Sequence, residues 1–138
     1  MALALRMGAD VIDPIFNGVN YQLARKLLDA TALRQEAIAT NLANVETPGF
    51  RRIDVAPDFA AQLKARCAAG DLLQAAASIR PQLIEDQTAR SIRPDGNTVE
   101  IETELMAMSR NAIEFEYLTE IVSSNLKQLK VAITGRVV

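Results

Sequence analysis

Few residues in this chain have the types and spacing that chemistry requires. Glu100, Glu102 and Glu104 form a cluster of carboxylates, and the first and last of them would share one face of a helix. Paired carboxylates of this kind serve as general acid and base or bind a hard cation, but no other ligand type accompanies them. We interpret the cluster as acidic residues that complement the positive end of a helix dipole. No catalytic and no metal-binding residue is therefore predicted.

Histidine and cysteine chemistry is equally restricted. The chain has no histidine, which excludes histidine general bases, Ser-His-Asp triads and histidine metal ligands. Its one cysteine, Cys67, cannot form an internal disulfide or a thiolate metal site. Because Cys67 lies in an alanine-rich run, we interpret it as a small apolar packing residue. No cofactor is predicted, and the residue types favour a structural or binding protein over an enzyme.

The overall composition indicates one folded domain with nearly balanced charge. Hydrophobic residues make up 49% of the 138 residues and aromatic residues only 4%, so we expect an aliphatic core. The 15 basic and 17 acidic side chains give a formal charge of −2, which argues against a nucleic-acid partner. No small-molecule substrate is predicted either. No apolar stretch approaches the roughly 20 residues of a membrane span, and we expect no cleaved secretory signal at the N-terminus.

Residues 19–45 are predicted to form an amphipathic helix. This stretch has no proline or glycine, and its apolar residues recur at steps of four and three. They are Leu23, Leu27, Ala30, Leu33, Ala37, Ile38, Leu42 and Val45. The helix should end at Thr47-Pro48-Gly49-Phe50, where Pro48 and Gly49 suit the centre of a type II turn. We expect the side chains of Asn41 and Asn44 to hydrogen-bond backbone groups of that turn.

Residues 98–134 carry the most regular pattern in the chain. One row of positions alternates steps of four and three over more than four heptads, as in a coiled coil. The row consists of Ile101, Leu105, Met108, Ala112, Phe115, Thr119, Val122, Leu126, Leu129 and Ile133. Only Thr119 interrupts its apolar character. A continuous helix here would be about 55 Å long, and Asn97 with Glu100 has the spacing of a capping box at its start.

The middle of the chain is predicted to be irregular. Residues 52–55 alternate polar and apolar side chains, which indicates a short strand or an extended arm. Residues 58–69 and 72–79 are expected to form short helices separated by Gly70. Residues 81–93 are polar and aperiodic and are predicted to be a loop, and a turn follows them at 94–97. We expect the pair Arg51-Arg52 to be solvated.

We therefore predict a mainly α fold in which the long N- and C-terminal amphipathic helices pack as a coiled coil. Residues 1–50 and 98–138 should form one structural unit, and residues 51–97 an irregular segment between them. The first helix, about 40 Å long, would cover about two thirds of the C-terminal row in an antiparallel hairpin. The rest of the row would contact other copies or other proteins, or the middle helices would cover it in a monomeric bundle.

Two segments resemble a known family. The first reads Ala39-Thr40-Asn41-Leu42-Ala43-Asn44-Val45-Glu46-Thr47-Pro48-Gly49-Phe50, and it closely resembles the N-terminal signature of bacterial flagellar rod and hook proteins. The second contains Asp95, Gly96 and Asn97, and it resembles the D-G-N-x-V that precedes the last helix in the FlgB-type proximal rod protein. A FlgC-type subunit would tend to have an asparagine- and proline-rich segment there. The FlgB type is therefore favoured, with the FlgC type as the alternative.

The resemblance implies a non-enzymatic building block of the flagellar basal body. Such a subunit would pass unfolded through the flagellar type III export apparatus without a cleaved signal, and would polymerise in the periplasm into the hollow rod. Its implied partners are copies of itself, a FliE-type junction protein, a FlgC-type rod protein, the MS ring and the export gate. A soluble helical adaptor or export chaperone is the alternative from another class.

The assembly interface is predicted on the apolar rows of both long helices. Its expected residues are Leu23, Leu27, Ala30, Ile38, Leu42, Ile101, Leu105, Met108, Phe115, Val122, Leu126, Leu129 and Ile133.

Overall fold

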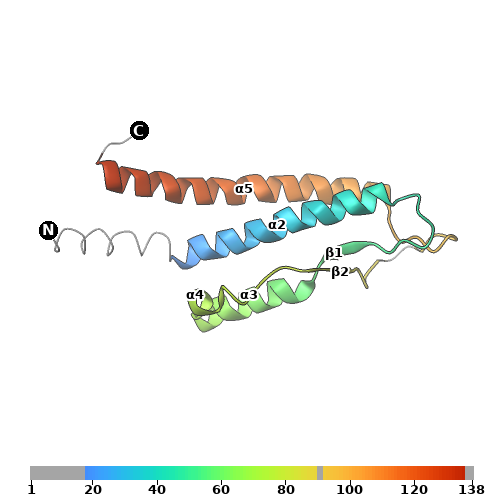
Figure 1. Ribbon diagram of the computed structural model, residues 1–138, viewed down its shortest axis with the longest axis horizontal. Helices are drawn as coiled ribbons and strands as arrows, with labels where there is room; N and C mark the ends of the chain where they lie inside the picture. Colours follow the sequence, from blue (N-terminus) through green and yellow to red (C-terminus); the bar gives the residue numbers. More distant parts are fainter. Residues whose placement is uncertain (1–17, 90–91, 136–138) are drawn as a thin grey trace.

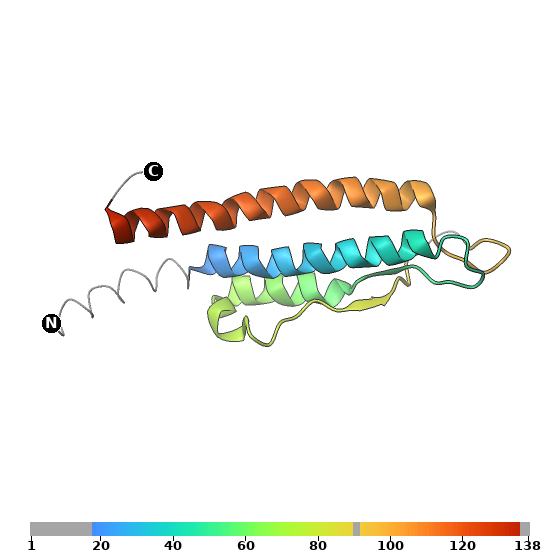
Figure 2. The ribbon, with the colours of Figure 1, turned by 45° about the horizontal axis from the view of Figure 1, so that its top comes forward.

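The computed structural model describes residues 18–89 and 92–135, and two long antiparallel helices dominate it. Its described elements are α2 (Val19–Ala43), β1 (Ile53–Val55), α3 (Pro57–Ala69), α4 (Leu72–Ala75), β2 (Leu83–Glu85) and α5 (Ile101–Thr134). In two views, α5 lies along one side of α2, while α3, α4 and the two strands lie along the other (Figure 1, Figure 2). α2 is thus the middle layer of the molecule (Figure 1, Figure 2). The prediction of a mainly α fold with the two long helices packed together is confirmed.

The long helices begin and end close to the predicted positions. α2 ends at Ala43, where the chain enters a turn in which the Phe50 amide donates to the Thr47 carbonyl at 3.2 Å. Gly49 has a φ of 73°, the left-handed conformation that the third position of a type II turn requires. α5 has 34 residues and is therefore about 51 Å long. No helix in the described part of the chain has the length and apolar character needed to cross a bilayer.

The middle segment is more ordered than predicted. The helix expected over 58–69 is confirmed as α3, but the second short helix ends at Ala75 and not at 79. The expected strand is confirmed as β1, which pairs antiparallel with β2 so that Val55 faces Leu83. The prediction of a loop throughout 81–93 is therefore wrong at residues 83–85. Three residues are too few to show a period, and a distant strand supplies their hydrogen bonds.

The hydrophobic core lies between α2 and the middle segment, not between the two long helices. Its buried members are Ala30, Val55, Phe59, Leu63, Leu72 and Ile79, and the partly buried Leu23, Leu27, Leu33, Cys67, Ala75 and Leu83 pack against them. Three residues predicted for the assembly interface therefore contribute to this core within the single subunit: Ala30 is buried in it, and Leu23 and Leu27 pack against it. Because α3 and α4 bring their own apolar side chains, they cover the α2 stripe that α5 was expected to cover.

Candidate functional site

The two motif segments lie together at one end of the helical hairpin, in an arrangement we call the clasp (residues 44–50 and 93–98). The side-chain amide of Asn97 donates to three carbonyl oxygens of the turn after α2, those of Asn44, Val45 and Thr47, at 3.0, 3.1 and 2.8 Å. Asn97 is fully buried. One side chain therefore joins the second loop to three backbone carbonyls of the first, each of which also accepts a hydrogen bond from another donor.

Backbone contacts close the clasp from both sides. The amide of Gly49 donates to the carbonyl of Asp95 at 2.8 Å, and the amide of Thr98 donates to the carbonyl of Phe50 at 3.1 Å. A Cβ added to Gly96, whose φ is 82°, would lie 3.5 Å from the Cα of Gly49, so the two glycines approach closely. The sequence motifs therefore mark two loops that pair with each other.

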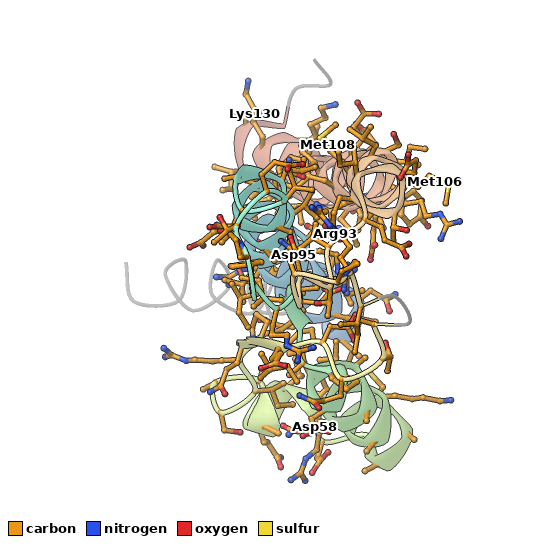
Figure 3. The ribbon with its side chains drawn as sticks, turned by 90° about the vertical axis from the view of Figure 1, so that its right-hand side faces the viewer. Asp58, Arg93, Asp95, Met106, Met108 and Lys130 are labelled. Atoms are coloured by element: carbon orange, nitrogen blue, oxygen red, sulfur yellow. The ribbon has the colours of Figure 1, made fainter. Side chains whose placement is uncertain are left out.

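Charged side chains cover the outside of the clasp. Arg93 donates to the carbonyl of Val45 at 2.8 Å and forms an ion pair with Asp95 at 3.2 Å. Arg93 and Asp95 lie near each other at the end of the molecule that faces the viewer, whereas Met106 points outward from α5 (Figure 3). Arg93 thus holds the 93–98 loop against the end of α2.

Two expectations about the asparagines require correction. Asn97 does not cap α5: Glu100 is the N-cap residue, and no side-chain hydrogen bond caps this end among the described residues. Asn97 binds the turn after α2 instead, because a buried amide with three acceptors in reach is better satisfied there. The side chain of Asn44 contacts only a side chain of the turn, since its Oδ1 accepts from the Thr47 hydroxyl at 3.2 Å, and its side-chain amide donates to the Thr40 carbonyl within α2 at 2.9 Å. Asn41 reaches past the turn and exchanges two hydrogen bonds of 2.9 Å with the backbone of Ile53.

Next to the clasp, a buried polar cluster joins α2, the strands and α5. Arg52 Nε lies 2.6 Å from Glu104 Oε1, and Arg52 NH1 lies 3.0 Å from Asp54 and 2.7 Å from Asp86. Asn41 donates to the other oxygen of Glu104 at 3.1 Å. The Glu104 side chain is completely buried. The expectations of a solvated Arg52 and of a purely dipole-complementing Glu104 are therefore wrong, because each is the other's buried counter-ion.

The electrostatics of the cluster follow from this pairing. Burial alone would lower the pKa of Arg52, but hydrogen bonds and charge attraction to Glu104 and Asp54 raise it above its ordinary value. Burial alone would raise the pKa of Asp86, but hydrogen bonds from Thr88 and from Arg52 lower it below its ordinary value. Arg52 and Asp86 are therefore charged at neutral pH, and their ion pair joins the two strand segments. No group of carboxylates or cysteine in the described residues could hold a metal ion.

The predicted row of α5, which we call the outer row, is largely exposed. It consists of the same ten residues that the sequence analysis identified: Ile101, Leu105, Met108, Ala112, Phe115, Thr119, Val122, Leu126, Leu129 and Ile133. Leu105 is 46% exposed and Ile133 64%, while Met108, Val122 and Leu129 are half-buried. The expectation that α2 covers two thirds of this row is therefore wrong.

α5 packs on α2 through a different set of residues, which we call the inner row: Glu104, Asn111, Leu118 and Asn125, at steps of seven. The first three are buried and Asn125 is half-buried. Asn111 donates to the Thr31 carbonyl at 2.9 Å and to the Gln35 side chain at 3.1 Å. Periodicity did not identify this row because most of its members are polar. Polar residues at three of four positions spaced seven apart, in a helix with many apolar residues, are the signal that could have identified it.

Comparisons with known proteins find matches both to the first loop of the clasp and to most of the chain. A sequence profile of the family described as "Flagella basal body rod protein" matches residues 28–51, which include the end of α2 and its turn. Relatives named "Flagellar basal body rod protein FlgB" match far more of the chain. The relative from Borrelia hermsii is 27% identical over 132 residues, covering 83% of this chain and 96% of its own length. The Escherichia coli K12 relative is 24% identical over 132 residues, covering 85% and 93%. The Proteus mirabilis HI4320 relative is 29% identical over 134 residues, covering 86% and 95%.

Proposed function

We infer that this chain belongs to the flagellar basal-body rod protein family, as a FlgB-type structural subunit of the proximal rod. The family profile covers the turn of the clasp, and the FlgB relatives align over most of their length. A rod subunit is a building block and not an enzyme, and it assembles with other rod proteins in the basal body. The exposed outer row of α5 is the observation that supports a surface for that assembly.

Assembly through the outer row follows from the hydrophobic effect. Large apolar side chains such as Leu105, Phe115 and Leu126 are each more than 40% exposed along one helix. Burying a side chain of this size against a neighbour contributes roughly 1.5–3 kcal/mol. A contiguous exposed apolar surface of this kind is characteristic of an interaction site. The α5 members of the predicted assembly interface therefore remain in the proposal. Its α2 members are left out of it, because they are buried (Ala30, Ile38) or partly buried (Leu23, Leu27, Leu42) within the subunit.

A second copy of this chain fits the outer row by charge. The exposed Glu100 and Glu102 stand at the N-terminal end of the row, and the exposed Lys127 and Lys130 stand near its C-terminal end. When two copies meet head to tail, the basic end of one row faces the acidic end of the next. Head-to-tail contacts are heterologous and produce open assemblies, as a rod requires.

The ends of such an assembly would contact other chains. The family resemblance supports a FliE-type junction protein and a FlgC-type rod protein as neighbours, with the MS ring and the export gate at the base. It also supports passage through the flagellar type III export apparatus without a cleaved signal. These partners and this route are part of the proposal.

Sedimentation of the purified chain over a range of concentrations, with far-UV circular dichroism at each, tests the proposed function. An open-ended assembly should grow continuously with concentration, because each added copy exposes the same surface again. A small oligomer whose size stays constant once formed would contradict a rod subunit and would favour the helical adaptor.

A further inference from the structure

α5 has two faces that could pack against α2, and the structure uses the less apolar one. Each inner-row residue directly precedes an outer-row residue, as Glu104 precedes Leu105 and Asn111 precedes Ala112. Adjacent residues on a helix are about 100° apart, so a rotation of that size would bring residues such as Leu105 to the place of the inner row and turn the inner row away from α2. The hydrophobic effect alone favours the rotated setting, in which the outer row is buried. Another interaction must therefore hold α5 in the observed setting.

The polar contacts of the inner row supply that interaction. The Glu104 carboxylate accepts hydrogen bonds from Arg52 at 2.6 Å and from Asn41 at 3.1 Å. Asn111 donates to the Thr31 carbonyl at 2.9 Å. Rotation would withdraw both side chains from α2 and the strands and place Leu105 beside Arg52. Buried polar and charged groups without partners are strongly disfavoured, so the rotated setting is penalised.

We infer that Glu104 and Asn111 are specificity-determining residues, which fix the rotation of α5 so that the outer row stays available to a second copy. This inference rests on the proposed function for the role of the outer row. A polar residue at a single position of a helix–helix interface is known to specify one packing arrangement at some cost in stability. Asn111 shows such a cost, because its buried Oδ1 has no hydrogen-bond partner among the described residues.

The test replaces Asn111 by leucine in the full chain and measures the rotation of α5 directly. In a Cys67→Ser background, a cysteine is placed either at Ala107, which is half-buried on the α2 side, or at Ala112, which is exposed in the outer row. The rate of maleimide labelling reports the exposure of each position. Before Asn111 is replaced, the cysteine at 112 should react at least about tenfold faster than the one at 107.

The Asn111→Leu variant should lose this difference, because its inner row no longer selects one setting. Its melting temperature should stay the same or rise, since the variant loses an unpaired buried oxygen and gains apolar volume. Asn125→Leu is the matched control. Asn125 occupies the same heptad position but donates to the Ile121 carbonyl of its own helix at 2.7 Å, so the labelling ratio should not change.

Glu104→Leu provides a second variant, in which Arg52 keeps Asp54 and Asp86 as counter-ions. A narrowed labelling ratio in either variant, with Asn125→Leu unchanged, would support the inference. An unchanged ratio in both folded variants would overturn it, whatever happens to assembly. If the ratio narrows but the concentration required for assembly stays within about twofold of the parent, the rotational role stands and the outer row is not the assembly surface. That result would contradict the proposed function separately.

Discussion

The side-chain nitrogen of Asn97 lies 2.8 Å from the carbonyl oxygen of Thr47, although the two residues are 50 positions apart in the chain. Thr47 belongs to the turn that ends α2, and Asn97 belongs to the loop that leads into α5. The contact therefore fixes the closed end of the hairpin. Two short motifs that are distant in sequence therefore bond directly to each other in the folded subunit.

Replacing Asn97 by alanine should destabilise the subunit by about 2–3 kcal/mol, because the buried Val99 amide loses its acceptor and the turn after α2 loses three hydrogen bonds to the second loop. Urea unfolding followed by circular dichroism measures the change. Asn20→Ala is a suitable control, since Asn20 is exposed in the first turn of α2 and its loss should cost less than about 0.5 kcal/mol. Similar losses in the two variants would show that the clasp contributes little.

The two motifs could be identified from the sequence, but the contact between them in the folded subunit could not. The spacing of Asn97 and Glu100 predicted a capping box, whereas the structure shows Asn97 bound to the turn after α2. Either role places a polar side chain just before a helix. The choice between them depends on whether a second loop presents acceptors to Asn97, and only the tertiary fold supplies that. The bounds of α2, α3 and α5 were predictable because proline, glycine and apolar periodicity are local signals.

Arg51 and Arg52 are adjacent and identical in type, yet the structure gives them different roles. The nearest carboxylate oxygen to Arg51 is that of Glu85 at 4.0 Å, at an exposed site, whereas Arg52 is the counter-ion of the buried Glu104. Arg52→Ala should therefore cost about 3–5 kcal/mol, since it leaves a buried carboxylate without a cation. Arg51→Ala should change the free energy of unfolding by less than about 0.5 kcal/mol. Thermal and urea unfolding of the two variants would disprove this assignment if both lost equal stability.

Asp86 should make stability depend on acid pH. Its pKa is lowered from the ordinary value of 3.8, so its contribution is present above that value and is lost as the pH falls through the lowered pKa. Asp86→Asn should therefore lower the free energy of unfolding by about 1–2 kcal/mol at neutral pH. The difference from the parent should shrink between about pH 5 and the acid unfolding range. Urea unfolding at several pH values measures it, and a difference that is constant with pH would contradict the role given to the Asp86 charge.

The polar cluster illustrates the second limit of sequence reasoning. Periodicity identified the outer row correctly as a row of apolar residues, but this row faces away from α2. Glu104 and Asn111 face α2 and the strands instead, where they form hydrogen bonds and an ion pair. Hydrophobic patterning assumes that the most apolar face is buried within the subunit. That assumption fails for this subunit, because α3 and α4 already cover the α2 stripe and a second apolar face on α5 stays exposed.

The outer row itself is tested by Leu105→Asp. Leu105 is 46% exposed, so the subunit should lose little stability, but a charge in the contact with a second copy would be buried without a partner. We expect the concentration needed for assembly to rise at least about tenfold, equivalent to about 1.4 kcal/mol. Ile113→Asp is the matched control, because Ile113 is 68% exposed and lies on the side of α5 opposite the inner row. Sedimentation of both variants measures their assembly, and the motility of strains that carry each variant measures their function. Together these measurements distinguish the outer row from the face that contains Ile113. If Ile113→Asp impairs assembly as much as Leu105→Asp, then the outer row has no special role, because a charge anywhere on α5 would have the same effect.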